Sequence, residues 1–182
     1  MKTSALRRWL VSLGLIALEQ TTRFTGGHDW SDMYKFKSKS LEDTNEFAKI
    51  LSKGLTKGSV ISLVGDMGAG KTTFTQYLLK QLGVLDYVTS PTFSLVNTYY
   101  GDFEINHLDL YRMENEIEME TLDIDLLFYP DGITIIEWAE RAKSYLPRNL
   151  IEIHIEKTST TGREFSILGN NREEKKLIER LQ

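Results

Sequence analysis

The residues best suited to chemistry lie in one stretch, Gly65 to Thr72, which reads GDMGAGKT and fits the pattern G-x-x-x-x-G-K-[ST]. Glycines at these positions let backbone N–H groups point inward and leave no Cβ in the way of a phosphate. The ammonium of Lys71 would neutralise β- and γ-phosphate oxygens, and the hydroxyl of Thr72 would ligate a magnesium ion that bridges them. The spacing therefore predicts a phosphate-binding loop.

The segments on either side of this stretch match what such a loop requires. Residues 60–64 form an apolar, β-branched run that predicts a strand, and a helix is predicted to begin at Lys71. This helix would bury an apolar face made of Phe74, Tyr77, Leu78 and Leu82. The alternative, a glycine-rich turn that binds nothing, is disfavoured because strand, loop and helix occur in the required order. We therefore predict nucleotide binding.

Two acidic residues at the ends of predicted strands are candidates for a role beside the phosphates. Glu137 ends the apolar run 133–136, and a strand end would hold its carboxylate rigidly across from the loop, to bind magnesium or its water shell. Asp109 also ends a strand and could order an attacking or magnesium-bound water. His107 shares a strand face with Asp109, but a lone histidine is more often a satisfied scaffold group, so we leave it out of the chemistry.

A cluster of Ser and Thr side chains at residues 88–94 surrounds Pro91. These hydroxyls could face a γ-phosphate or its magnesium as a switch segment, and the alternative is a solvated turn. Residues 114–128 are rich in Asp and Glu, which favours a solvated helical face over a second metal site, or a surface that meets a partner.

Composition and charge narrow the class of protein. The chain has 182 residues, of which 41% are hydrophobic and 26% charged, which suits one globular domain with a sizeable core. A net charge of -4 excludes the polycationic field that binds duplex nucleic acid indiscriminately, so a link to RNA would run through partners or a local patch. The absence of cysteine excludes disulfides and thiolate metal sites and fits a reducing cytoplasm.

Residues 1–32 differ from the rest of the chain. Basic residues precede an apolar run at 9–18, in the order of a secretory signal, but no convincing small-residue cleavage site follows. The run is also shorter than the roughly 20 apolar residues that span a bilayer. We expect this stretch to be a disordered extension or not part of the native protein, and residues 33–182 to form the organised domain.

Periodicity and turn residues place the remaining elements. Strands are predicted at 34–38, 60–64, 93–100, 103–108, 133–137, 149–156 and 163–168, and helices at 43–55, from 71, within 114–128, from 138 and at 172–181. The segments 93–108 and 150–168 have the pattern of antiparallel hairpins, whereas the strand before the loop needs a crossover partner. We predict a single α/β domain of P-loop NTPase type, with a mixed parallel and antiparallel sheet flanked by helices.

Four blocks of the sequence together resemble one family. They read GDMGAGKTTF at 65–74, SPTFSLV at 90–96, HLDLYR at 107–112 and IEW at 136–138. In this order and spacing they are similar to the TsaE (YjeE) family of bacterial ATPases, which are required to make N6-threonylcarbamoyladenosine in tRNA. The resemblance covers residues 34–168. The chain departs from the family at Ala139, where relatives usually have proline, and in the extension before residue 33.

The resemblance implies a set of site residues. Those implied to act in catalysis are Lys71, Asp109 and Glu137, and those implied to hold magnesium are Thr72 and Glu137. The segment from Ser90 to Thr92 would behave like a switch. Residues implied to contact ATP are Leu41, Thr44, Asp66, Met67, Gly68, Ala69, Gly70, Lys71, Thr72, Thr73, Thr92 and Arg163. Within this set, Leu41 and Thr44 would lie by the adenine.

The resemblance also implies a mechanism and partners. ATP hydrolysis would reset a complex with the TsaB and TsaD heterodimer between rounds of tRNA modification, with tRNA contacted only through that complex and no membrane involved. Turnover would be weak without the partners, because no built-in arginine finger is evident. A small-molecule or nucleoside kinase and a non-catalytic nucleotide-binding adaptor stay open as alternatives. A GTP-dependent switch protein is excluded, because an N-K-x-D-type guanine reader and a D-x-x-G turn are missing from the sequence.

Overall fold

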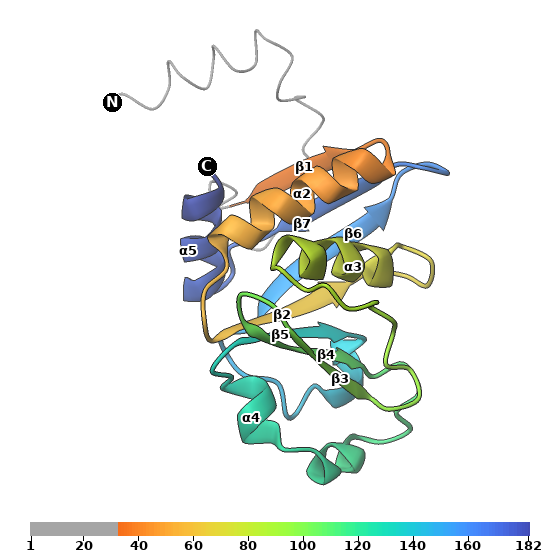
Figure 1. Cartoon of the computed structure of the whole chain (residues 1–182), viewed down its shortest axis with the longest axis vertical. Coiled ribbons are helices and arrows are strands. Elements are labelled where there is room, and N and C mark those ends of the chain that lie inside the picture. The colour runs from red at the N-terminus through yellow and green to blue at the C-terminus, as the bar shows by residue number, and fades with distance from the viewer. Residues whose placement is uncertain (1–32) are drawn as a thin grey trace, which may run out of the picture.

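A seven-stranded sheet organises the part of the chain that the structure describes. The structure is a computed structural model and describes residues 33–182, so the prediction made for residues 1–32 lies outside it. Within residues 33–182, no helix is long and apolar enough to cross a membrane. The elements are β1 (Tyr34–Ser38), α2 (Leu41–Gly54), β2 (Ser59–Val64), α3 (Lys71–Gln81), β3 (Val96–Tyr100), β4 (Glu104–Asp109), the 3-10 helix η2 (Glu116–Thr121), α4 (Ile124–Phe128), β5 (Ile133–Glu137), the 3-10 helix η3 (Ala139–Ala142), β6 (Ile151–Lys157), β7 (Arg163–Ile167) and α5 (Arg172–Leu181) (Figure 1).

The sheet is mixed, which confirms the predicted fold class. Its strand order is β1-β7-β6-β2-β5-β4-β3. The inner strands β6, β2, β5 and β4 are parallel, whereas the β6–β7 and β3–β4 hairpins and the β1–β7 pair are antiparallel. Because parallel strands point the same way, the carboxyl ends of β2, β4 and β5 meet at one edge of the sheet. Asp109 and Glu137 are direct neighbours there.

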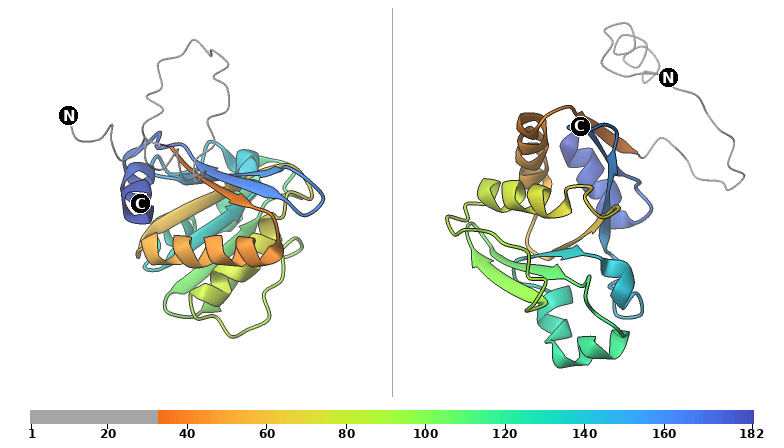
Figure 2. Two further views of the ribbon diagram at one scale, coloured as in Figure 1. Left: turned by 90° about the horizontal axis from the view of Figure 1, so that it is seen from above. Right: turned by 90° about the vertical axis from the view of Figure 1, so that its right-hand side faces the viewer.

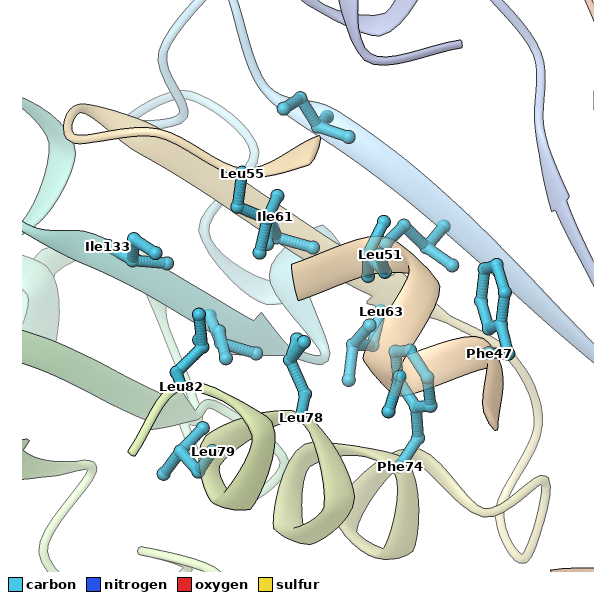
Figure 3. Close-up of a cluster of buried hydrophobic side chains, with 14 of the residues drawn as sticks. Phe47, Leu51, Leu55, Ile61, Leu63, Phe74, Leu78, Leu79, Leu82 and Ile133 are labelled. Carbon is cyan, nitrogen blue, oxygen red and sulfur yellow. The ribbon is translucent and has the colours of Figure 1, made fainter. Parts of the chain in front are cut away.

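Helices α2 and α3 cover the same face of the sheet (Figure 2). Helix α2 is capped by Ser40, whose hydroxyl accepts a hydrogen bond from the N–H of Asp43. Under the helices lies an aromatic core in which the fully buried Phe47 packs against Phe74 of α3, with 5.4 Å between ring centroids (Figure 3). Phe47 also packs against Phe165 of β7, at 4.6 Å between ring centroids. These rings tie the start of α3, and hence the phosphate loop, to the rest of the fold.

A second hydrophobic cluster lies outside this core and fixes the ends of β4 and β5. It joins Leu108 and Ile136 of these strands to Met119 of η2 and Phe128 of α4, all of them buried. Because β4 and β5 also contribute Ile105 and other side chains to the aromatic core, they are packed on both faces. The strand ends that carry the two acidic residues are therefore rigid.

Apart from shifts of one or two residues at element ends, two predicted elements differ from the structure, and both lie near the edge that carries the acids. Strand β3 begins at Val96 rather than 93, because the N–H groups of Ser94 and Leu95 both bond to the carbonyl of Pro91 in a turn. The helices predicted within 114–128 are present, as the 3-10 helix η2 and the short α4. The helix predicted from Trp138 is reduced to η3, because Trp138 has a left-handed backbone with φ of 60°.

Candidate functional site

The loop between β2 and α3 has the backbone of a phosphate cradle. Gly68 and Gly70 have φ values of 77° and 102°, a conformation that favours glycine. Gly65 comes so close to β6 that a Cβ there would lie 2.5 Å from the carbonyl oxygen of Ile155. Helix α3 begins at Lys71 with no side-chain cap, so its first N–H groups and the positive end of its dipole remain open to an anion.

Lys71 is buried, and its ammonium is turned back onto the loop. Nζ donates to the carbonyl oxygen of Gly65 at 2.6 Å and of Asp66 at 3.0 Å, and it lies 4.0 Å from the ring centroid of Trp138. Burial lowers the pKa of Lys71, and the charges of nearby carboxylates, Glu137 first among them, oppose that shift. The cation is thus stabilised inside the protein by two carbonyl groups and an aromatic face.

Glu137 reaches the loop from the carboxyl end of β5. It is only 2% exposed; its Oε2 accepts a hydrogen bond from the hydroxyl of Thr72 at 3.0 Å, and its Oε1 lies 3.0 Å from Nε2 of His107. Thr72 belongs to the first turn of α3, and His107 belongs to β4. Both partners of this carboxylate therefore lie in regular, well-packed elements.

Asp109 is the neighbour of Glu137 in the sheet, but a different kind of segment holds it. Its Oδ2 accepts hydrogen bonds from the hydroxyls of Ser90 and Thr92, the latter at 2.9 Å, and its Oδ1 accepts one from the N–H of Tyr111 at 3.1 Å. Ser90 and Thr92 lie between α3 and β3, outside any helix or strand. The hydroxyls that could face a γ-phosphate thus donate to the carboxylate of Asp109 in this structure.

A cavity of about 480 Å³ joins these groups. It is lined by Met67, Gly68, Gly70, Lys71, Thr72, Thr73, Ser90, Thr92, Asp109, Tyr111, Glu137, Trp138 and Arg163. The structure therefore brings together the three predicted catalytic residues and both predicted magnesium ligands. It does not bring the side chain of Asp66 into this cavity, because Asp66 lines a separate hollow between the loop and the β6–β7 hairpin.

A second cavity of about 570 Å³ adjoins the first and shares Gly70, Thr73 and Arg163 with it. Its other walls come from the start of α2, the phosphate loop and the β6–β7 hairpin, namely Lys39, Ser40, Leu41, Glu42, Thr44, Ala69, Thr160, Thr161 and Phe165. Leu41 is 59% exposed and free to contact a flat ring. Thr44 lines the wall as well, but its hydroxyl is engaged with Ser38 at 2.8 Å and with the carbonyl of Ser40 at 3.1 Å.

Arg163 stands at the boundary of the two cavities. Its Nε donates to the carbonyl of Ala69 at 2.6 Å, its Nη2 donates to that of Gly68 at 3.4 Å, and its Nη1 donates to that of Gly162 at 2.7 Å. The guanidinium thus clamps the β6–β7 hairpin onto the phosphate loop. It is placed between the expected positions of a base and of its phosphates.

The sequence motifs assign no role to three residues that lie at the site. Tyr111 and Trp138 line the first cavity, and their rings lie 5.1 Å apart. His107 contacts Glu137 from inside the sheet. A signal existed for Trp138, which follows Glu137 directly, and for His107, whose alternation with Asp109 placed both on one strand face.

The oxygen atoms around Thr72 suit a magnesium ion. Its hydroxyl lies 3.0 Å from Oε2 of Glu137, and the carboxylate of Asp109 is carried by the adjacent strand. Within residues 33–182, no group of three or more His, Cys, Asp or Glu could hold a metal ion on its own. Magnesium commonly takes one or two carboxylates together with phosphates of the substrate, so these residues fit an ion shared with a nucleotide.

Comparison with known proteins gives one consistent family. Residues 38–165 match the family model described as "Threonylcarbamoyl adenosine biosynthesis protein TsaE". The chain is 37% identical over 142 residues to the Bacillus subtilis protein of that description, covering 76% of this chain and 89% of the relative. It is 33% identical to the Treponema pallidum protein, covering 71% and 96%. The crystal structure of Bacillus subtilis YdiB superposes with a TM-score of 0.69 at 31% identity, covering 82% of this chain and 93% of that one. The chain belongs to the TsaE family, the threonylcarbamoyladenosine biosynthesis proteins.

Proposed function

We propose that this protein binds ATP with magnesium and hydrolyses it in the pathway that makes N6-threonylcarbamoyladenosine in tRNA. One observation carries the proposal: the loop residues Lys71 and Thr72 and the strand-end acids Asp109 and Glu137 converge on one cavity. This is the set of groups that P-loop hydrolases use to hold phosphates, a metal ion and a water molecule.

The two adjoining cavities divide the nucleotide between them in this proposal. The adenine lies in the second cavity against Leu41, with Thr44 in the wall, and Arg163 contacts the nucleotide at the boundary. The phosphates lie on the loop and the open end of α3. Lys71 leaves the carbonyls of its own loop and donates to phosphate oxygens instead.

In this proposal Thr72 and Glu137 are the two residues that would hold magnesium. The ion, when bound, supplies positive charge that offsets the charge developing on the phosphate oxygens. The hydroxyl of Thr72 and Oε2 of Glu137 already lie 3.0 Å apart, facing the loop. Asp109 orients the attacking water once its hydrogen bonds to the hydroxyls of Ser90 and Thr92 are broken. The breaking of these two bonds is the switch in this proposal.

The chain acts with TsaB and TsaD in the cytoplasm, and the tRNA meets it only through that complex. Support for these partners comes from the family and from the charged residues that line the first cavity. The arginine among them, Arg163, already donates to loop and hairpin carbonyls. Stabilisation of transition-state charge by an arginine can be worth about 10³ to 10⁵ in rate, so we expect slow turnover alone and faster turnover with the partners.

The test is magnesium-dependent ATP hydrolysis by the full chain, alone and with purified TsaB and TsaD, beside a Lys71→Ala control. Stimulation by the pair that Lys71→Ala abolishes supports the proposal. Fast turnover without partners that needs a small acceptor molecule would replace it with a kinase. Undiminished tRNA modification by Glu137→Ala, which cannot hold the ion, would make the protein a nucleotide-binding adaptor.

A further inference from the structure

One buried histidine lies next to the site and has no role in the proposed mechanism. His107 is completely buried in the middle of the sheet, in register with Ile135 of β5. Its Nε2 lies 3.0 Å from Oε1 of Glu137. This contact is diagonal, since the strand neighbour of Glu137 on β4 is Asp109 rather than His107.

The direction of this hydrogen bond follows from the chemistry of the two groups. An ionised carboxylate has no proton to give, so Nε2 of His107 must carry the hydrogen and donate it to Glu137. The other oxygen of Glu137 accepts from Thr72 at 3.0 Å. Each carboxylate oxygen therefore has one donor, and the two donors lie on different elements, so the plane of the carboxylate is fixed.

The remaining nitrogen of the ring argues against a purely structural role. Nδ1 of His107 is buried and has no hydrogen-bond partner among residues 33–182. A buried polar atom without a partner destabilises a fold, and such atoms call for an explanation other than packing. An apolar side chain would fill the same space without that cost. What only the histidine provides is the donor to Oε1 of Glu137.

We propose that His107 is a positioning residue, which orients the carboxylate of Glu137 so that Oε2 stays beside the hydroxyl of Thr72 where magnesium binds. The inference rests on the proposed function, because it assigns His107 to the same metal site. His107 does not touch the ion or the nucleotide. It acts through Glu137, as the hydrogen-bond partners of metal ligands commonly do.

The experiment compares two polar replacements that differ in reach. In His107→Gln the side-chain amide can occupy the place of Nε2 and donate to Glu137, whereas in His107→Asn it ends near the place of Nδ1 and falls short. Binding of a non-hydrolysable ATP analogue to the full chain is measured by calorimetry in magnesium chloride and in EDTA. Thr134→Val, which removes a buried hydroxyl without a partner from the adjacent strand, is the matched control.

We expect His107→Asn to lower the magnesium-dependent gain in affinity by about 10- to 100-fold, the usual range for a partner of a metal ligand. Affinity in EDTA should stay the same, and His107→Gln and Thr134→Val should keep the magnesium response. If thermal melting shows that His107→Asn does not fold, His107→Met provides the side chain without a donor.

The outcomes separate this inference from the proposed function. A wild-type chain that binds the analogue equally with and without magnesium overturns both. A wild-type magnesium response that His107→Asn retains overturns only the role of His107. Equal losses in EDTA and in magnesium for His107→Asn and His107→Gln would show a purely structural residue, and would also overturn it.

Discussion

Asp109 and Glu137 are the same kind of group at the same edge of the sheet, one strand apart, yet their surroundings differ. Glu137 is held by Thr72 of α3 and by His107 of β4, which are parts of packed elements. Asp109 is held by side chains of a loop. Packed elements thus hold one acid and loop hydroxyls the other, which suits the exchange of partners that we propose for Asp109.

The loop that holds Asp109 has the features of a segment that can rearrange. The carbonyl of Pro91 accepts hydrogen bonds from the N–H groups of both Ser94 and Leu95 in a turn. Leu95 has a φ of 62°, a conformation that costs energy for a residue other than glycine. Phe93 within it is 87% exposed. Phe93 and Ser94 are exposed and bury little apolar surface, in contrast to the core under α2 and α3.

The largest expected effect is on the rate of hydrolysis, from a change to Asp109, the acid that the loop holds. Asp109→Asn removes the charge that orients water in the proposed mechanism, so hydrolysis should fall by about 10²–10⁴-fold. Binding of magnesium and nucleotide should persist, because Thr72 and Glu137 are untouched. Single-turnover hydrolysis and calorimetry measure the two quantities. A parallel loss of magnesium-dependent binding would place Asp109 among the ion's ligands and contradict the division of roles.

Glu137→Gln is the matching change to the acid that packed elements hold. Hydrolysis should fall by about 10²–10³-fold, the cost of losing one electrostatic group of a catalytic site. In contrast to Asp109→Asn, the affinity gained from magnesium should fall as well, and affinity in EDTA should not. The same calorimetric titration decides this. An unchanged magnesium response would mean that Glu137 does not hold the ion.

A smaller effect is expected when the two hydroxyls that connect the loop to Asp109 are removed. Ser90→Ala combined with Thr92→Val removes both hydroxyls from Asp109, at about 1 kcal/mol for each hydrogen bond. Hydrogen exchange of the amides of residues 90–95 should therefore accelerate, and the melting temperature should fall by about 4 to 8 °C. Ser94→Ala is the control, because its hydroxyl contacts Asn97 and the carbonyl of Pro91 and leaves Asp109 untouched. Equal exchange in the double variant and wild type would show that these bonds do not hold the loop.

The smallest effect concerns pH. Burial lowers the pKa of Lys71 below its ordinary value of 10.5, so the ammonium loses its charge at a lower pH than an exposed lysine does. The value of kcat/KM for ATP reports ionisations of the free protein, and it should decline as pH rises through this lowered pKa. Magnesium-independent affinity for ADP should decline over the same range. A decline that begins only above 10.5 would contradict the burial effect.

Much of the scaffold followed from the sequence, because its signals are local. The phosphate loop, the strand that carries Glu137 and the helix Arg172–Leu181 each depend on spacing within a few residues. The partners of the acids are not local: Thr92 lies 17 residues from Asp109, and His107 lies 30 residues from Glu137. Such contacts depend on strand order and register, which the pattern of one strand does not contain.

The prediction of a helix from Trp138 was wrong for a related reason. Trp138 interrupts a helical pattern with a left-handed backbone, which brings its ring beside Lys71 and Tyr111. Local propensity favours a helix there, but contacts with residues far away in the sequence determine the conformation. The site is thus where sequence patterns are least informative.

The internal contacts of Lys71 make phosphate binding an exchange reaction. A nucleotide that attracts the ammonium must first replace the carbonyls of Gly65 and Asp66 and the face of Trp138. The affinity for a phosphate is therefore a difference between two sets of contacts of one cation, and it is weaker than the phosphate contact alone would give. When the phosphate leaves, the same carbonyls and ring can receive the ammonium again. The free loop thus competes with the phosphate for its own lysine.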